Sequence, residues 1–490
     1  MPPFKSLITL DKTADVSVFL QLAEQIRGLI GENALKPGQK LPGTRQLAAL
    51  LGVHRKTVIA AFDELLAEGW LESRAGSGTF VANPLPLVRP EAFAQPADSQ
   101  WLRKEPGFVF VSKPHRQRPL LLMNDGLRLD DGFPDIRLAP MDELARAYRS
   151  YFRWGNPQQH FGYGDPRGNR LLREELSAHL NETRALRTTA DNILIVRGSI
   201  MGIHLVSQLL LERGQLAVVG ETNWSGANMN FLETGADLQT VPVDPYGIDV
   251  DALADLCARR PVRLVYVTPH HHYPTTVTMP SDRRLRLLEL SQQYGFAILE
   301  DDYDYEFHYF RRPIVPLASA DQHGMVIYIG SLSKSVAPAF RIGYLVAPET
   351  VIDELGRLRR IIDRQGDPML EFAVGQLFRN GAMRRHLKKA HQVYAARCKY
   401  FCSLVDSALE GAVRFKQPEG GLAVWATFAD GIDPKTLAQK AANHGLLLSD
   451  GLAHNPPGKQ LNSTRLGFAS STETELEQSV GILRKLIFNR

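Results

Sequence analysis

The sequence predicts two unequal folded parts, a small helical domain with a two-stranded wing and a large α/β domain with a mainly parallel sheet. Two helical patterns joined by a glycine turn, followed by a short hairpin, indicate the first part. Apolar strand-like runs that alternate with helical stretches over residues 121–490 indicate the second. Such alternation is typical of a sheet that helices cover on both faces.

Charge and cysteine content exclude several classes of protein. The chain has 490 residues, with 57 Lys and Arg against 53 Asp and Glu, a net charge of +4. This balance excludes nucleic-acid binding through bulk charge, but allows a local basic face. Three cysteines (Cys257, Cys398 and Cys402) cannot form a disulfide framework, and Cys398 and Cys402 lack a second pair of metal ligands nearby. Without a signal-peptide pattern or a membrane span, we expect a cytoplasmic protein with no membrane partner.

Residues 1–83 are predicted to form a winged helix-turn-helix domain. Apolar residues between Phe19 and Ile30 recur at three-and-four spacing, which is typical of an amphipathic helix. The Gly52-Val53 turn separates two further helices. The predicted elements are, in order, helices over 19–30, 44–51 (with Thr44 as its N-cap) and about 54–67, then strands over 71–73 and 79–81.

The last of these helices would present its N-terminal residues to double-stranded operator DNA, as a recognition helix does. Residues 1–83 carry nine Lys and Arg against eight Asp and Glu, so the DNA interpretation depends on where the basic residues lie. The candidate DNA contacts are Arg45, His54, Arg55, Lys56, Thr57, Arg74 and Ser77.

This segment resembles the winged-helix DNA-binding domain of the GntR family. The likeness lies in residues 35–42, Arg45-Gln46-Leu47-Ala48, Leu51-Gly52-Val53, Arg55-Lys56-Thr57-Val58 and residues 76–81. Gly43 and His54 stand where the family usually has serines. At His54, the loss of a serine cap would weaken the helix start by about 1 kcal/mol, or the imidazole would reach a phosphate instead. The sequence leaves both readings open.

Residues 84–120 are predicted to form a linker. Prolines stand at positions 84, 86, 90, 96, 106, 114 and 119, with no sustained periodicity between them. Proline at this density resists helix and central-strand formation and makes a semi-stiff spacer. Such a spacer allows the two domains of one chain to belong to different halves of a dimer.

Three polar clusters follow predicted strands of the large domain, where ligands of parallel sheets gather. In Gly330-Ser331-Leu332-Ser333-Lys334, two hydroxyls suit a phosphate and the lysine is a potential Schiff-base nucleophile. Gly198-Ser199 opens a helix whose amides would bind a phosphate, and Asp301-Asp302-Tyr303 needs a cationic or hydrogen-bonding partner. The predicted strands are 193–196, 216–219, 262–267, 296–300 and 326–329, and the predicted helices are 171–180, 199–211 and 283–294.

From about Asn124 onward the chain resembles fold-type I pyridoxal-phosphate enzymes, the aspartate aminotransferase superfamily. Behind a GntR-like winged helix, it resembles the MocR/GabR family of transcriptional regulators. The resemblance implies a large domain over 121–365 and a smaller C-terminal α+β part over 366–490. The motifs that carry it are residues 163–168, Tyr266-Val267-Thr268-Pro269, residues 300–307, Ser333-Lys334, Phe340-Arg341-Ile342-Gly343-Tyr344 and Arg465-Leu466-Gly467-Phe468.

The resemblance implies a cofactor, pyridoxal 5'-phosphate, and a role for each matched residue. Lys334 would form the internal aldimine, Asp301 would pair with the pyridinium nitrogen, and Tyr303 would bind the phenolic oxygen. Tyr163 would reach the cofactor phosphate of the other subunit, which implies a homodimer, and Arg465 would grip an effector carboxylate. The residues expected around the phosphate are Gly198, Ser199, Ser331, Ser333 and Arg341.

Departures from the family lie around the ligand side of the cofactor. Residues 222–226 replace a Pro-x-Tyr-Pro-Gly stretch, and Trp224 there could stack on the ring. Ser-His-Gln-Tyr-Pro-Thr-Gly becomes residues 270–276, with three histidines and with Thr276 in place of a glycine. Adjacent residues of an extended chain point to alternating sides, so we expect no metal. The usual Gln-Gln pair is absent from residues 198–201. The changes predict a retained cofactor and an unusual effector.

The sequence therefore favours a regulator that senses an amine or amino acid through aldimine exchange at Lys334. Alternatives are a catalytically active aminotransferase that carries a winged helix, and a regulator that senses pyridoxal phosphate itself. A DNA-binding domain has no evident use in a metabolic enzyme, so we expect at most a vestigial transaminase half-reaction. The sequence does not identify the effector, the operator or the sign of regulation.

Overall fold

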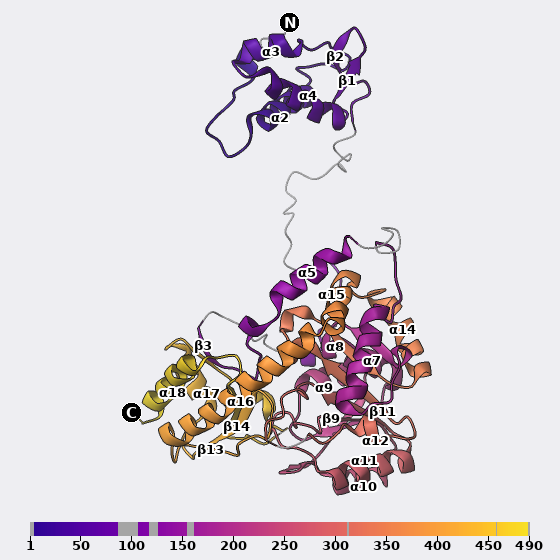
Figure 1. Ribbon diagram of the computed structural model, residues 1–490, viewed down its shortest axis with the longest axis vertical. Helices are drawn as coiled ribbons and strands as arrows, with labels where there is room; N and C mark the ends of the chain where they lie inside the picture. The colour runs from indigo at the N-terminus through magenta and orange to yellow at the C-terminus, as the bar shows by residue number, and fades with distance from the viewer. Residues whose placement is uncertain are drawn as a thin grey trace. The chain divides into compact units, whose positions relative to one another are not determined.

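The computed structural model describes residues 4–86, 106–116, 126–153, 161–310, 313–456 and 458–488. It divides the chain into two compact units, a small unit over residues 1–111 and a large unit over residues 112–490 (Figure 1). Among the described residues, no helix is long and apolar enough to cross a membrane.

The small unit has the predicted order of helices followed by a wing. One core of the small unit contains five fully buried side chains, those of Leu22, Ile26, Leu47, Val58 and Leu65. The apolar residues that recur along its helices are therefore the ones that pack together. The two strands pair antiparallel. The elements are α1 (Phe4–Leu7), α2 (Val18–Gly31), α3 (Thr44–Leu51), α4 (Arg55–Ala67), β1 (Leu71–Arg74) and β2 (Gly78–Val81).

Helices α3 and α4 of the small unit begin with caps that the sequence did not predict. The N-cap of α3 is Gly43, not Thr44, which is the first residue of the helix. His54 caps α4, because its Nδ1 accepts a hydrogen bond of 3.2 Å from the backbone N–H of Lys56. The imidazole therefore caps the helix in place of the serine that the family usually has there.

The large unit contains a seven-stranded sheet in the order β4-β12-β11-β10-β9-β5-β6. Neighbouring strands are parallel except around β12, which is antiparallel to both β4 and β11. This confirms the mainly parallel sheet. The strands are β4 (Ile193–Val196), β5 (Leu216–Gly220), β6 (Asp237–Val241), β9 (Val262–Val267), β10 (Ala297–Asp302), β11 (Val326–Ser331) and β12 (Gly343–Val346).

Helices cover both faces of this sheet. Along β4, Ile193 and Ile195 join one apolar cluster, whereas Leu194 and Val196 join another, because alternate residues of a strand face opposite sides. The helices are α5 (Met141–Tyr151), α7 (Arg170–Arg184), α8 (Gly198–Leu210), α9 (Ser225–Glu233), α10 (Val250–Cys257), α11 (Ser281–Tyr294), α12 (Leu317–Ala320), α13 (Leu332–Ser335), α14 (Glu349–Ile362) and α15 (Pro368–Arg379).

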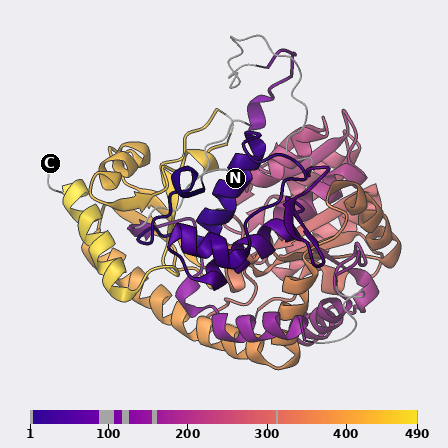
Figure 2. The ribbon, with the colours of Figure 1, turned by 90° about the horizontal axis from the view of Figure 1, so that it is seen from above.

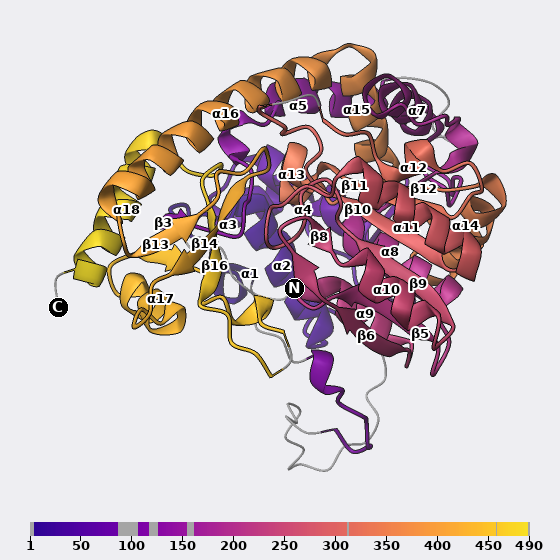
Figure 3. The same cartoon turned by 90° about the horizontal axis from the view of Figure 1, so that it is seen from below.

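The C-terminal part has a core of its own. The 27-residue helix α16 (Ala382–Ala408) runs along the border of the large unit from α15 towards α18 (Glu473–Phe488) (Figures 2 and 3). The strands β13 (Val413–Phe415), β14 (Ala423–Phe428) and β16 (Ser463–Gly467) form an antiparallel sheet. Two further elements are α17 (Pro434–Ala442) and β15 (Leu446–Leu448).

One strand from the start of the large unit belongs in space to this C-terminal part. β3 (Leu127–Leu129) pairs in parallel with β15. The sequence predicts residues 127–129 as part of the 121–365 domain, because a pairing between segments more than 300 residues apart leaves no local pattern.

The predicted linker overlaps the large unit, which begins at Ser112. Lys113 Nζ lies 3.0 Å from Glu233 Oε1, His115 Nε2 lies 2.9 Å from Glu233 Oε2, and Arg116 pairs with the same carboxylate. The Arg116 guanidinium, with His115 and Lys113, holds the pKa of Glu233 well below its usual range. We call this contact the Glu233 anchor. It fixes residues 113–116 to the C-terminal end of α9.

Candidate functional site

A cavity of about 200 Å³ lies where β9, β10 and β11 end in the large unit. The structure brings eight of the predicted site residues to its wall, namely Ser199, Trp224, Asp301, Tyr303, Ser331, Ser333, Lys334 and Arg341. The wall also contains six residues that were not among the predicted site residues, namely Asp131, Phe133, Ile200, Tyr266, Tyr273 and Pro338.

Asp301 is a buried carboxylate with one oxygen still without a partner. It lies in β10, which extends past the predicted strand end, and its Oδ2 accepts a 2.8 Å hydrogen bond from the Tyr266 hydroxyl. No hydrogen bond reaches Oδ1. Burial, together with the charges of Asp302 and Asp304, raises the pKa of Asp301 to about 7. A protonated ring nitrogen would supply the missing partner and favour the charged carboxylate.

Lys334 enters the cavity from α13, directly after β11. Its Nζ donates a 2.8 Å hydrogen bond to the Gly132 carbonyl and lies 3.9 Å from the centre of the Phe133 ring. Burial lowers the pKa of this lysine. A lowered pKa increases the fraction of neutral amine, which is the form that attacks a carbonyl carbon.

The other end of the cavity is built for an anion. Ser199 lies in the first turn of α8, where backbone amides are free to bind a phosphate. Gly198 has φ +77°, and a Cβ there would lie 2.9 Å from Arg341 Nη2, so only glycine lets the guanidinium come so close. Ser331 Oγ accepts a 3.1 Å hydrogen bond from the Ser333 N–H. Two hydroxyls, a guanidinium and a helix start fit the phosphate of pyridoxal phosphate.

Aromatic side chains also line the cavity. Trp224 is the N-cap residue of α9, and a Cβ on Gly226 would lie 2.7 Å from its indole, so the glycine makes room for the ring. The Tyr303 hydroxyl donates a 3.0 Å hydrogen bond to the His271 carbonyl. The sequence predicts that the Tyr303 hydroxyl binds the phenolic oxygen of the cofactor. In the structure it binds the backbone carbonyl of His271.

Arg465, the predicted carboxylate grip, is already paired within the chain. It is 1% exposed, its Nε lies 3.0 Å from Asp131 Oδ1, and its Nη1 donates to the Pro274 carbonyl. The Tyr273 hydroxyl donates a 2.7 Å hydrogen bond to Asp131 Oδ2, and the guanidinium lies 4.9 Å from the centre of the same tyrosine ring. Asp131 lines the cavity, whereas Arg465 lies behind it.

Tyr163 does not line the cavity of its own chain. It is 79% exposed, and the Arg364 guanidinium lies 4.1 Å from the centre of its ring.

The histidine run departs from the alternation expected for an extended chain. The ring centres of His270 and His271 are only 4.4 Å apart, whereas His272 turns elsewhere and its Nδ1 lies 2.7 Å from the Thr275 hydroxyl. Thr276 has φ +62°, a left-handed conformation that the usual glycine would adopt without strain. The loop is tightly turned, so neighbouring side chains share a side.

The candidate DNA contacts of the small unit lie on its surface. Arg45 is exposed on α3, and Arg55 and Lys56 are exposed in the first turn of α4. Arg74 lies at the end of β1, where its guanidinium is 4.6 Å from the centre of the Phe80 ring. The other three candidates are the cap residue His54, the half-buried Thr57 in α4 and the exposed Ser77 in the wing turn.

Comparison with known proteins gives two family matches. Residues 19–81 match the bacterial regulatory proteins of the gntR family, and residues 127–483 match aminotransferase class I and II. The chain is 30% identical to a probable rhizopine catabolism regulatory protein, MocR, of Rhizobium meliloti, over 98% of this chain and 95% of that protein. It is 29% identical to the HTH-type transcriptional regulator TauR of Rhodobacter capsulatus, over 95% and 96%.

Among solved structures, the large unit is similar to a kynurenine aminotransferase of Pyrococcus horikoshii. The TM-score is 0.69 at 26% sequence identity, over 75% of this chain and 91% of that one.

Proposed function

Because the chain belongs to the MocR-type transcriptional regulators, we propose that an amine or amino-acid effector controls its binding to operator DNA. Its gntR-type domain binds DNA, and its aminotransferase-like domain binds pyridoxal phosphate. The effector enters the cofactor cavity and takes the place of Lys334. The observation that carries the proposal is Lys334 itself, a lysine of lowered pKa in a cavity with an anion-binding end and an unpartnered carboxylate oxygen.

Bound pyridoxal phosphate supplies an aldehyde carbon to which either a lysine or a ligand amine can attach. Asp301 would hold the proton on the ring nitrogen through Oδ1, and Arg341 with the α8 N-terminus would hold the phosphate. When a ligand amine occupies the aldehyde, the freed Lys334 Nζ would donate its hydrogen bond to the Gly132 carbonyl, as it does here.

The segment 131–133 links the two ends of the effector site. Its Gly132 carbonyl binds Lys334, and its Asp131 carboxylate binds Arg465. A carboxylate on the effector must compete with Asp131 for this guanidinium, so each end of the ligand acts on the same segment. β3 precedes it directly and pairs with β15, so a shift here reaches the C-terminal part. A ligand shifts the protein between two states only through such differential contacts.

The exposed Tyr163 supports a homodimer in which it reaches the cofactor phosphate of the other subunit. Two DNA-binding units on one dimer would bind two half-sites of an operator. A regulator that binds operator DNA acts where that DNA is, and we place this one in the cytoplasm.

The test is an operator footprint of the full-length, cofactor-loaded protein across a panel of amines and amino acids, with absorbance recorded in parallel. Lys334→Ala is expected to keep DNA binding but to lose the covalent chromophore and the response to the effector. Arg465→Ala is expected to require a higher concentration of any effector with a carboxylate. Lys399→Ala, an exposed lysine of α16, is the matched control. An unchanged effector response in Lys334→Ala would refute the mechanism.

A further inference from the structure

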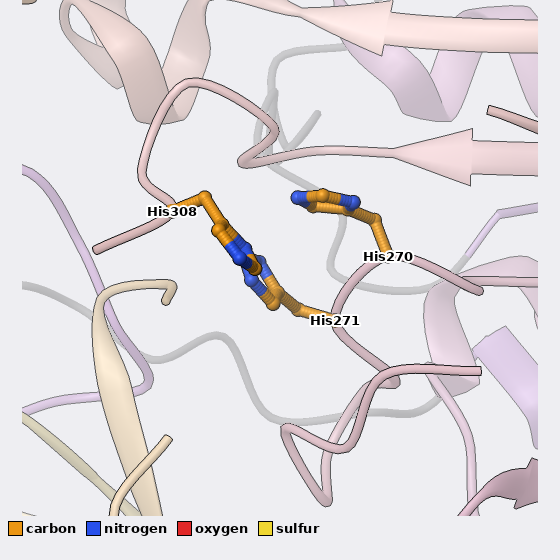
Figure 4. A group of neighbouring side chains, drawn as sticks. All are labelled: His270, His271 and His308. Carbon is orange, nitrogen blue, oxygen red and sulfur yellow. The ribbon is translucent and has the colours of Figure 1, made fainter. Parts of the chain in front are cut away.

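Three buried imidazoles from two separate loops of the large unit meet beside the cofactor cavity. His270 and His271 come from the loop between β9 and α11, and His308 comes from the loop between β10 and α12 (Figure 4). The rings of His271 and His308 stack with their centres 5.8 Å apart, and the ring of His270 lies 4.4 Å and 5.4 Å from them. Their cavity-side neighbour is Tyr303, whose hydroxyl binds the His271 carbonyl.

These rings lack the hydrogen bonds that buried nitrogens need. The three residues are 3%, 2% and 8% exposed. Both nitrogens of His270, both of His308 and Nε2 of His271 have no hydrogen-bond partner. One nitrogen of each ring lies within 4.8 Å of the others. A buried polar atom without a partner is costly, so five of them together point to a missing ligand.

We propose that His270, His271 and His308 form a binding site for one divalent transition-metal ion of the zinc type. Imidazole nitrogen is a preferred ligand of zinc, copper, nickel and iron, whereas magnesium and calcium take oxygen ligands. A tetrahedral zinc ion holds its ligand nitrogens about 3.3 Å apart. Ligation therefore draws the three rings together by about 1.5 Å at most, which small side-chain rotations supply.

The surroundings prepare these rings for a cation. His271 Nδ1 lies 2.7 Å from Asp304 Oδ1, which leaves Nε2 without a hydrogen-bond partner. A carboxylate behind a histidine is the usual support of a zinc ligand.

An ion at this site would tie the C-terminal part to the loops around the cofactor. His308 forms an isolated β-bridge with Gly420, in the segment between β13 and β14. A Cβ on Gly420 would lie 2.5 Å from His271 Nε2, so this backbone covers the cluster closely. Cross-linking His270, His271 and His308 would hold both loops beneath Gly420. Metal occupancy is therefore expected to raise the melting temperature of the large unit.

The loop offers a matched pair of variants. His270→Ser and His272→Gln each restore the residue that the related family usually has, so both are expected to fold. Only the first removes a proposed ligand, since His272 binds Thr275 outside the cluster. His308→Gln removes a second ligand, and Asp304→Asn removes the carboxylate that orients His271.

The experiment is titration of the EDTA-treated, cofactor-loaded full-length protein with Zn²⁺ and with Co²⁺. Wild type and His272→Gln are expected to bind one tight ion per chain and to show the visible absorption of four-coordinate Co²⁺. His270→Ser and His308→Gln are expected to lose at least about 100-fold in affinity, and Asp304→Asn about 10–100-fold. Equal ion content and equal Co²⁺ spectra in wild type and His270→Ser would overturn the proposal, as would a wild type that binds no ion.

Discussion

The candidate DNA contacts of the small unit and the candidate cofactor residues of the large unit are held in opposite ways. Three exposed basic residues lie within a dozen positions of one another, namely Arg45, Arg55 and Lys56. The phosphates of bound DNA would neutralise their charges. The cavity residues are spread along the chain between Asp131 and Arg341, and the protein must offset the burial of their charges itself. A surface site can therefore be changed with little effect on its fold, whereas each cavity residue supports its neighbours.

The largest effect that this contrast predicts is on DNA affinity. The double variant Arg55→Ala plus Lys56→Ala removes two exposed charges from the first turn of α4. We expect operator affinity to fall by at least about tenfold and the slope of log affinity against log salt to fall by about two. Fluorescence anisotropy at several salt concentrations measures both, with melting temperature as the control. An unchanged operator affinity would mean that α4 is not the recognition helix.

The second prediction tests whether the two units communicate through the Glu233 anchor. Glu233→Gln removes the charge that three basic linker residues share. Allosteric coupling usually amounts to about 5–150-fold in affinity, and we expect the effector-dependent change in operator affinity to fall towards unity. Affinity for DNA without effector is expected to stay within about twofold. Glu175→Gln, a surface pair with Arg379, is the control. A full effector response in Glu233→Gln would exclude this route.

The third prediction concerns the burial of Asp301 in the cofactor-free protein. Its folded pKa of about 7 exceeds the unfolded value of 3.8, so the folded state binds the proton more tightly. Protonation then stabilises the fold, and this stability is lost as the pH rises from about 4 through about 7. Asp301→Asn should lack this loss, which amounts to about 1 kcal/mol per pH unit.

Urea unfolding of both cofactor-free proteins between about pH 5 and pH 8 measures this difference. In the cofactor-loaded wild type, the pyridinium partner should remove most of it. Parallel pH dependence in the two cofactor-free proteins would show that the carboxyl of Asp301 is not perturbed by burial.

The smallest expected effect is at the His54 cap. His54→Ala removes the acceptor for the Lys56 N–H, which should cost about 0.5–2 kcal/mol of stability in the small unit. His54→Ser should restore most of it. Thermal unfolding of the full-length protein, followed in the transition of the small unit, measures the change. If His54→Ala lost operator affinity without losing stability, the imidazole would be a DNA contact instead.

Local patterns predicted most of the fold. β4 and β9 begin and end at the predicted residues, and α4 ends at the predicted Ala67. Hydrophobic periodicity reports these elements because each packs along its own length. The strands β10 and β11 end two residues later than predicted. Each prediction stopped where the apolar run stopped, whereas the strand continues through the residues that follow, to the cavity.

What the sequence could not provide are contacts between distant segments. Asp131 pairs with Arg465 across more than 300 residues, and no spacing rule connects them. The sequence did not predict the histidine cluster, because only the fold brings His308 to the pair His270 and His271. In addition, the loop that carries this pair turns more tightly than an extended chain. The residue types were visible, but their proximity depends on the sheet order.

The Glu233 anchor also defines the length of the tether between the units. From Val81, the last residue of β2, to Lys113 the chain has about 30 residues, whose full extension is about 100 Å. Half-sites one helical turn apart on DNA lie about 35 Å from each other. In the proposed dimer, a chain of this length would allow each small unit to reach its half-site from either direction. The operator would then carry either inverted or direct repeats, and the spacing between the repeats would set the effective concentration of the second contact.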